Sequence, residues 1–304
     1  MLNYSRKSNS IDVSIIIVNY NTCRLTENCI KSIYEKTRDI SFEVILVDNA
    51  SKDGSKELFI NDSRIEYIYL DDNIGFGRAN NEGLKKAKGR NIFFLNSDTL
   101  LINNAVKILS NYLDDNSRIG AAGGNLYSNQ GTSIHSYRRL SPIAFELNTM
   151  LANIPSKIFF GRNEEHNHTE RPIVVNTIVG ADLMVKKSIL EKLGGFDTRF
   201  FMYCEETDLC HRIRKLGYKI VSVPDSQIIH LEGASFSKDR FFERIKMNRK
   251  SLNLYCSLHY GRFYAVIVEK LWRMTILSRI IVYTLLGFSN KRKFWKTIEK
   301  TCTI

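Results

Sequence analysis

Residues 13–19 read VSIIIVN, an unbroken apolar and β-branched run that ends in Asn19. Such a run predicts a strand that is buried on both faces, as in a parallel sheet covered by helices. Residues 43–48, EVILVD, form a second run of this kind and end in Asp48. Between the two runs, residues 23–37 carry apolar side chains at helical spacing. Strand, helix and strand in this order predict a doubly wound α/β sheet.

The same alternation continues outward along the chain. Residues 65–70, 79–87 and 92–95 are predicted to form a strand, a helix and a fourth strand. Residues 118–190 are less regular, apart from strand character at 174–187. A helix at 205–216 and a strand at 218–223 complete the α/β part, and the chain is helical, basic and aromatic from 236 onward.

The charge of the chain is concentrated at one end. The 304 residues carry a net charge of +12, and residues 236–304 hold 15 basic and 4 acidic residues, which leaves +1 for the rest. We therefore expect a catalytic or binding domain at 1–235 and a basic helical region at 236–304. A localised basic region indicates an anionic partner, either nucleic acid or a membrane surface.

Cysteine usage and hydropathy indicate the compartment. The six cysteines form no C-x-x-C pair, so a zinc site is not expected. The first residues lack the apolar stretch of a signal peptide, and no run approaches the roughly 18 apolar residues of a membrane span. We expect a cytoplasmic protein with free thiols that meets a membrane only at its surface.

Polar residues follow the predicted strands at the point where each strand ends. In doubly wound sheets, ligands bind at the carboxyl ends of the strands. Short polar side chains at these ends are suited to contact a nucleobase and ribose, although Asp48 alone is equally explained as a helix cap. The residues concerned are Asn19, Tyr20, Asn21, Asp48 and Asn49.

A glycine-rich segment, NIGFGRANNEG at residues 73–83, precedes a predicted helix. It lacks the dinucleotide-binding pattern G-x-G-x-x-G, because Asn80 stands at the last glycine position. Gly75 allows the backbone to approach a ligand closely, and Arg78 is long enough to reach a phosphate. The segment is either a ligand-binding loop or a glycine-rich turn before a helix.

Asn96, Ser97 and Asp98 follow the apolar strand IFFL. A carboxylate at a strand end can hold Mg²⁺ or Mn²⁺, which in turn binds a diphosphate. His230 follows another apolar strand and is either a second metal ligand, a phosphate contact or a structural histidine.

Residues 200–208, FFMYCEETD, place three carboxylates beside an apolar approach. Carboxylates crowded near apolar walls have raised pKa values, as a general base requires. Acidity at a helix N-terminus is the structural alternative. On a helix Glu205 shares a face with Asp208, and Asp208 can pair with Arg212. We therefore assign Asp208 a structural role and Glu206 the catalytic one, with Glu205 as the alternative base.

Taken in order, these segments resemble family 2 glycosyltransferases of the GT-A fold, and more narrowly the bacterial rhamnosyltransferases of O-antigen and capsule assembly. The resemblance covers about residues 12–236. The matching segments are VSIIIVNYN, EVILVDNASKDGS, NIGFGRANNEG, FFLNSDT, GADLMV, GGFDTRFFMYCEETDLCHR and the segment that contains His230.

The resemblance implies an inverting transfer from a nucleotide-diphospho-sugar. Asp98 resembles the last acid of the DXD motif, which binds the divalent metal, and Glu206 resembles the base of the ED motif. The motifs here read NSD and EE, with one carboxylate fewer at the first and a longer base at the second. Implied donor contacts are Asn19, Tyr20, Asn21, Asp48, Asn49, Gly75, Arg78, Asn80, Asn96, Ser97 and Asp98. Gly180 and Asp182, within GADLMV, are expected on the acceptor side or in a structural role.

The narrower resemblance favours dTDP-L-rhamnose as donor, with a UDP-hexose as the alternative. The expected acceptor is a lipid-linked glycan bound by residues 125–172 and the tail. The tail mixes basic, apolar and aromatic residues, which predicts helices lying on the anionic inner face of a membrane. A helical cap on the catalytic domain and a dimer interface are the alternatives. Nucleic acid is excluded because the α/β part is nearly neutral, and a non-catalytic sugar-nucleotide binder would not need the carboxylates at 205–208.

Overall fold

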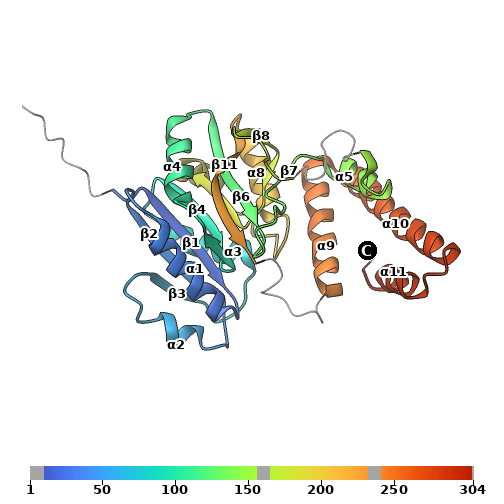
Figure 1. The fold of residues 1–304 in the computed structure, drawn as a ribbon, viewed down its shortest axis with the longest axis horizontal. Helices are drawn as coiled ribbons and strands as arrows, with labels where there is room; N and C mark the ends of the chain where they lie inside the picture. Colours follow the sequence, from blue (N-terminus) through green and yellow to red (C-terminus); the bar gives the residue numbers. More distant parts are fainter. Residues whose placement is uncertain (1–9, 156–164, 232–240, 303–304) are drawn as a thin grey trace, which may run out of the picture.

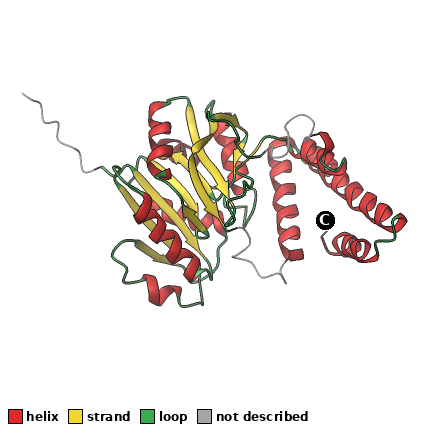
Figure 2. Ribbon diagram, in the orientation of Figure 1, coloured by secondary structure: helices red, strands yellow, loops and turns green. Residues whose placement is uncertain are grey.

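The computed structural model describes residues 10–155, 165–231 and 241–302. An α/β body holds the sheet, and a group of helices stands beside it (Figures 1 and 2). The helices of this second part are α9 (Phe241–Tyr260), α10 (Arg262–Leu285), α11 (Ser289–Cys302) and α5 (Pro142–Met150).

One large sheet forms the centre of the body, in the strand order β3-β2-β1-β4-β10-β6-β11-β5, with β8 paired to β11. β1, β2, β3 and β4 run parallel to one another, and β10 is antiparallel to both β4 and β6. The carboxyl ends of β1, β2 and β4 therefore meet at one edge of the sheet. The strands are β1 (Val13–Asn19), β2 (Phe42–Asp48), β3 (Glu66–Tyr69), β4 (Asn91–Asn96), β5 (Thr99–Leu101), β6 (Ile119–Tyr127), β8 (Ile173–Val175), β10 (Asp182–Lys186) and β11 (Lys219–His230), and β7 (Tyr137–Arg138) pairs separately with β9 (Thr177–Ile178).

Helices cover both faces of this sheet and explain the unbroken apolar strands. Ile15 and Ile17 face one core cluster with α1 (Cys23–Lys36) and α4 (Ala105–Asp115). Ile16 and Val18 face the opposite cluster with α3 (Phe76–Lys86), α7 (Lys187–Leu193) and α8 (Glu205–Lys215). Because successive side chains of a strand point to opposite faces, a strand buried on both sides must be apolar throughout. A short helix, α2 (Ser55–Phe59), follows β2.

The helical part gathers elements from two places in the sequence. α5 comes from the middle of the chain and packs along α10. Arg249 of α9, which is 6% exposed, forms ion pairs with Glu146 of α5 and with Glu269 of α10, the latter at 3.0 Å. Its guanidinium also lies 4.4 Å from the ring of Trp272. Since a buried charge is tolerated only when it is paired, this cluster fixes the three helices together.

The fold class expected from the sequence is confirmed, with two differences in extent. α3 begins at Phe76 rather than at residue 79, and β11 extends to His230 rather than ending at 223. The expected domain boundary at 235 falls within 232–240, outside the described residues, as do residues 156–164 of the expected acceptor region. Within the described ranges, no helix is long and apolar enough to cross a bilayer.

Candidate active site

The side chain of Asn19 holds the carboxyl end of β1. It is fully buried, and its Oδ1 accepts hydrogen bonds from the Thr22 hydroxyl at 2.7 Å and the Thr26 hydroxyl at 3.0 Å. Its Nδ2 donates to Ser51 Oγ at 3.0 Å. Asn19 therefore joins the start of α1 to the loop after β2, and its acceptor oxygen is used within the protein.

Asp48 and Asn49 fix the loops at the end of β2. Asp48 Oδ1 accepts from the Ser51 N–H at 2.8 Å and Oδ2 from the Tyr67 hydroxyl at 2.8 Å. Burial, together with the bond to Asp48, raises the pKa of Tyr67, so the phenol stays protonated as a donor. Asn49 Oδ1 accepts from the Ile74 N–H at 3.0 Å, which ties this end of the sheet to the glycine-rich segment.

Tyr20 and Asn21 are exposed, unlike the other residues expected to contact a nucleobase and ribose. Tyr20 is 39% exposed, and Asn21 adopts a left-handed conformation with φ of 53°. Asn21 Oδ1 accepts from the Lys52 N–H at 2.7 Å. The polar residues at the ends of β1 and β2 are thus buried, whereas the aromatic ring of Tyr20 is exposed beside them.

The glycine-rich segment docks against the segment that precedes α8. Gly75 has φ of 90°, and a Cβ at this position would lie 2.4 Å from the carbonyl oxygen of Phe201. The Phe76 N–H donates to the same oxygen at 2.9 Å. Arg78 is exposed, and its Nε donates to the Thr198 carbonyl at 2.7 Å. Only glycine permits this close approach, so Gly75 positions the two segments against each other.

Asn96, Ser97 and Asp98 lie at the end of β4, beside the end of β11. Asp98 Oδ1 is 3.3 Å from His230 Nε2, and the Asn96 amide nitrogen is 3.5 Å from the same atom. Ser97 Oγ lies 3.0 Å from Thr22 Oγ1. Asp98 is 6% exposed, and the Leu231 N–H donates to its backbone carbonyl at 2.9 Å. The structure therefore joins two residues that are 132 positions apart in the sequence.

A carboxylate and an imidazole at this distance suit a divalent cation such as Mn²⁺. No group of three or more His, Cys, Asp or Glu side chains that could hold a metal occurs in the described part of the chain. Asp98 and His230 therefore fit a cation that takes its remaining ligands from a diphosphate and water, as is usual for metal ions bound with phosphate substrates.

Glu205 and Glu206 begin α8 after an unusual turn. Tyr203 and Cys204 both have left-handed conformations, with φ of 69° and 64°. Consecutive left-handed residues other than glycine cost on the order of 1–3 kcal/mol each and persist where the surrounding structure requires them. Here they turn the chain sharply out of the apolar segment 200–202 and into the helix that carries the carboxylates.

The two glutamates occupy different surroundings. Glu205 is 5% exposed, packs toward Gly77, and its Oε2 has no hydrogen-bond partner within the described residues. Burial, with a contribution from the charge of Glu206, raises the pKa of Glu205 well above its usual range. Glu206 is partly exposed, lies against Gly180, and accepts a hydrogen bond at Oε1 from the Thr207 hydroxyl at 3.1 Å.

Asp208 has the structural pairing predicted from its spacing. Its Oδ2 accepts from Arg212 Nε at 2.7 Å, and its Oδ1 lies 2.7 Å from His259 Nε2 on α9. His211 stacks on His259 with ring centroids 4.1 Å apart and bonds through Nδ1 to the Tyr255 hydroxyl at 3.1 Å. Burial, followed by the neighbouring His259, lowers the pKa of His211 to about 4. Neutral His211 and its neighbour Asp208 thus connect α8 to the helical part.

Gly180 and Asp182 lie on either side of the start of β10. Gly180 faces Glu206, whereas Asp182 is fully buried in the sheet. Asp182 Oδ2 accepts from the Gly124 N–H at 2.6 Å, and burial raises the pKa of this carboxyl well above its usual range. The structure therefore places Asp182 in the core and Gly180 at the site.

Two further residues hold the site and were not among the expected site residues. Asn81 bonds twice to Phe196, with Nδ2 donating to the carbonyl at 2.8 Å and Oδ1 accepting from the N–H at 2.9 Å. Its neighbour Asn80 is buried and donates to the Phe76 carbonyl within α3. His259 is the other, because its contact to Asp208 spans 51 residues. The indication for Asn81 in the sequence was its place within the glycine-rich segment NIGFGRANNEG.

Comparison with known proteins shows where this arrangement occurs. A family model described as glycosyl transferase family 2 matches residues 14–194. Rhamnosyltransferase WbbL of Escherichia coli K12 is 28% identical over 230 residues, which cover 72% of this chain and 83% of that protein. The N-acetylglucosaminyl-diphospho-decaprenol L-rhamnosyltransferase of Mycobacterium tuberculosis is 30% identical over 139 residues, which cover 45% of this chain and 44% of that protein.

Other relatives are much longer than this chain, and the match spans as little as 16% of their length. Among solved structures, the mannosyltransferase PcManGT of Pyrobaculum calidifontis, in complex with GDP-Man and Mn²⁺, superposes with a TM-score of 0.59 at 16% identity. The alignment covers 97% of this chain and 86% of that one, which confirms the GT-A fold. Because the family model matches more than half of the sequence and the fold agrees with it, the chain belongs to glycosyl transferase family 2.

Proposed function

We propose that the chain transfers a sugar from a nucleotide-diphospho-sugar to a hydroxyl of a glycan acceptor, with inversion at the anomeric carbon. One observation carries this proposal. Glu206 lies against Gly180, and the neighbouring residue Ala181 accepts a hydrogen bond from the Asn96 N–H at 3.0 Å. The EE and NSD segments are therefore adjacent at the carboxyl edge of the sheet, where a base and a diphosphate site are both required.

Glu206 is the general base in this proposal. Its carboxylate is partly exposed and oriented by Thr207, so it can take the proton of an acceptor hydroxyl as that oxygen attacks the anomeric carbon. Attack opposite the departing diphosphate inverts the configuration. Asp98 and His230 would hold a divalent cation, which when bound offsets the charge that develops on the diphosphate. Glu205 is buried and packs toward Gly77.

The names of two relatives support a rhamnosyl donor, dTDP-L-rhamnose, for this chain. A UDP-hexose remains the alternative, because the buried polar residues at the ends of β1 and β2 do not by themselves distinguish nucleotides. The name of the mycobacterial relative includes a lipid diphosphate, which supports a lipid-linked glycan as the acceptor here.

The helical part supports a membrane-surface location. Apolar side chains with 45–81% exposure follow one another at three or four residues along α10, apart from one gap of eight residues, and this spacing places them on one stripe. Lys270 lies within this stripe, and Lys291, Arg292 and Lys293 follow at the start of α11. An apolar stripe with basic residues fits the surface of an anionic bilayer on the cytoplasmic side. The stripe consists of Phe263, Val266, Met274, Leu277, Ile281 and Leu285.

A donor screen tests the proposed activity. We expect dTDP-L-rhamnose with Mn²⁺ to raise the melting temperature of the purified protein, since a ligand at about 100 times its Kd adds roughly 2.7 kcal/mol of stability. UDP-glucose and UDP-galactose serve as comparison donors. A larger shift with a UDP-sugar would overturn the rhamnosyl assignment, and no shift with any of the three donors would count against the proposed activity.

Two substitutions test the assigned roles. Asp98→Ala should remove the metal-dependent part of the shift and abolish turnover. Glu206→Gln should keep the shift while lowering the turnover rate by at least about 100-fold, as for a lost general base. Glu205→Gln is the matched control and should retain most of the rate. If Glu205→Gln loses the rate and Glu206→Gln does not, the base has been assigned to the wrong residue.

A further inference from the structure

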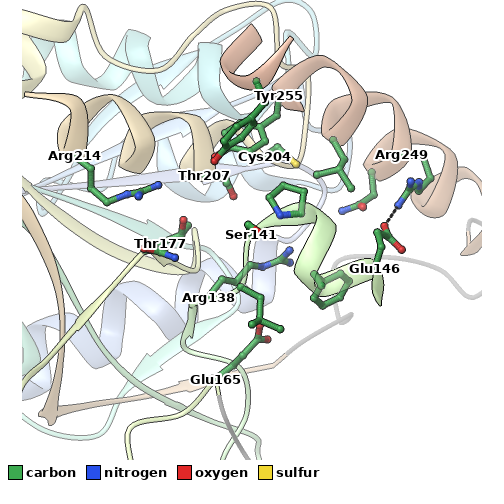
Figure 3. Close-up of a pocket in the computed structure, with 17 residues that line it drawn as sticks. Arg138, Ser141, Glu146, Glu165, Thr177, Cys204, Thr207, Arg214, Arg249 and Tyr255 are labelled. Atoms are coloured by element: carbon green, nitrogen blue, oxygen red, sulfur yellow. Dashed lines mark hydrogen bonds and ion pairs between the residues drawn. The ribbon is translucent and has the colours of Figure 1, made fainter. Parts of the chain in front are cut away.

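A cavity opens between the α/β body and the helical part. It encloses about 820 Å³, part of which is open to solvent, and β7, β9, α8, α5 and α9 all contribute to its lining (Figure 3). Thr207 is one of the lining residues, and its hydroxyl is the group that bonds to Glu206. The cavity therefore lies on the side of α8 next to the proposed base.

The acidic residues of this cavity are already paired. Glu146 forms its ion pair with Arg249, which is itself also paired with Glu269. Glu165 pairs with His135, with Oε2 and Nδ1 2.8 Å apart. The carboxylates of the lining thus already have partners within the protein.

Two arginines of the lining have no such partner. Arg138 of β7 and Arg214 of α8 form no ion pair with any described residue. Figure 3 shows both side chains among those that surround the cavity. Arg214 Nε is buried and has no hydrogen-bond partner within the described residues. A buried donor without a partner is uncommon and calls for an explanation such as a bound ligand.

The surroundings of the arginines favour an anionic ligand. A guanidinium offers a planar set of donors that matches a phosphate group. The first turn of α5, capped by Ser141, also lines the cavity, and a helix N-terminus carries partial positive charge. Phe145, Tyr255 and Tyr260 add aromatic and apolar surface for a sugar or a hydrocarbon chain.

We propose that Arg138 and Arg214 bind a phosphate or diphosphate group of the acceptor and so hold its sugar hydroxyl beside Glu206. This proposal rests on the proposed function for its link to catalysis, whereas the anion site itself follows from the cavity. The anionic group belongs either to a lipid-linked acceptor or to a soluble phosphorylated sugar, and both have the same chemistry at the two arginines.

Binding of inorganic pyrophosphate to the full chain tests the site without turnover. Calorimetry in the presence of EDTA keeps pyrophosphate from binding through a divalent cation. Arg138→Gln and Arg214→Gln should each weaken pyrophosphate binding by about tenfold or more. Arg139→Gln and Lys215→Gln remove the same charge at neighbouring positions outside the cavity lining, and they should leave the dissociation constant within about twofold.

Arg138 is exposed, so its replacement should leave folding intact, and the melting temperature of each variant checks this. Equal losses in all four variants would mean diffuse attraction to a basic surface and would overturn the site. So would the failure of the wild-type chain to bind pyrophosphate at millimolar concentration.

Two further ligands distinguish the sources of the anionic group. A short-chain prenyl diphosphate that binds more tightly than pyrophosphate, with the same dependence on Arg138 and Arg214, supports a lipid-linked acceptor. Tighter binding of a sugar 1-phosphate supports a soluble one. These are binding measurements, so they are independent of turnover. If the wild-type chain transfers sugar but does not bind pyrophosphate, this inference alone is refuted. Intact pyrophosphate binding in a chain that transfers no sugar would refute only the proposed function.

Discussion

Glu205 and Glu206 are neighbours in the sequence, yet one is enclosed by the protein and the other reaches the site. A helix turns by about 100° per residue, so adjacent side chains point to different surroundings. Helical spacing alone was enough to predict that Asp208 pairs with Arg212 and that Glu206 points elsewhere. The ion pair between Asp208 and Arg212 is confirmed. The depth to which Glu205 is buried depends on Gly77, which lies far away in the sequence.

The burial of Glu205 makes a pH-dependent contribution to stability. Because the folded state raises its pKa, this carboxyl holds its proton more firmly when folded than when unfolded. The wild-type protein therefore loses stability from this group as the pH rises above the ordinary glutamate value of about 4.3. Glu205→Gln cannot titrate, so its free energy of unfolding relative to wild type should increase between about pH 4 and 7.

The slope of that increase is at most about 1.4 kcal/mol per pH unit, the value for a single proton. Urea unfolding of both proteins at several pH values measures it. A difference that stays constant with pH would show that Glu205 ionises as readily in the folded protein as in the unfolded chain.

Among the elements, the strands rich in β-branched residues could be predicted, and β6 could not. β6 reads IGAAGGNLY, whose small residues have little strand propensity. The structure gives the reason, since a Cβ on Gly123 would lie 2.3 Å from the Ile178 side chain and one on Gly124 would lie 2.5 Å from the Ser226 carbonyl oxygen. Glycine is therefore required here by residues that are distant in the sequence. The local sequence contains no pattern from which these contacts could be predicted.

The contact between the glycine-rich segment and the segment before α8 can be tested by substitution. Gly75→Ala introduces a methyl group against the Phe201 carbonyl oxygen and also forces alanine to adopt a φ of 90°. Gly131→Ala is the matched control, because Gly131 has φ of 74° and open space around it. The control should lose about 1 kcal/mol, the backbone cost alone, and Gly75→Ala about 1–3 kcal/mol more. Denaturant unfolding compares the two, and equal losses would contradict the close approach.

At the scale of the whole molecule, the basic tail could be predicted from charge counts, but its partnership with α5 could not. Residues 142–150 carry no charge pattern that links them to the tail, and the link is the ion pair of Glu146 with Arg249, 103 residues away. The NSD and His230 segments were likewise expected at the site from the resemblance, and their 3.3 Å approach depends on the pairing of β11 with β5 and β6.

The exposed stripe of α10 predicts binding to anionic vesicles. Phe263→Glu and Leu285→Glu change side chains that are 80% and 81% exposed, so folding should be preserved. Each should reduce partitioning to phosphatidylglycerol vesicles about tenfold, because an apolar contact worth roughly 1.5–3 kcal/mol is lost. Ile60→Glu, at an exposed apolar position of the α/β body, should have no effect.

Sedimentation of the protein with vesicles at low and high salt measures this partitioning, which should weaken as salt screens the basic residues. If the wild-type chain does not sediment with vesicles and the α10 variants instead change its size on gel filtration, the stripe is an interface between two copies of the chain.

The contacts of His259 with Asp208 and of Tyr255 with His211 bear on the exchange of parts between relatives. The family model ends at residue 194, before the helix that carries Glu206, and α9 supplies a partner to a buried carboxylate of that helix. A chimera that joins this α/β body to the helices of another protein would leave Asp208 with only Arg212 unless the new helix brings its own histidine. Recombination that exchanges the helical part must therefore carry α8 and α9 together.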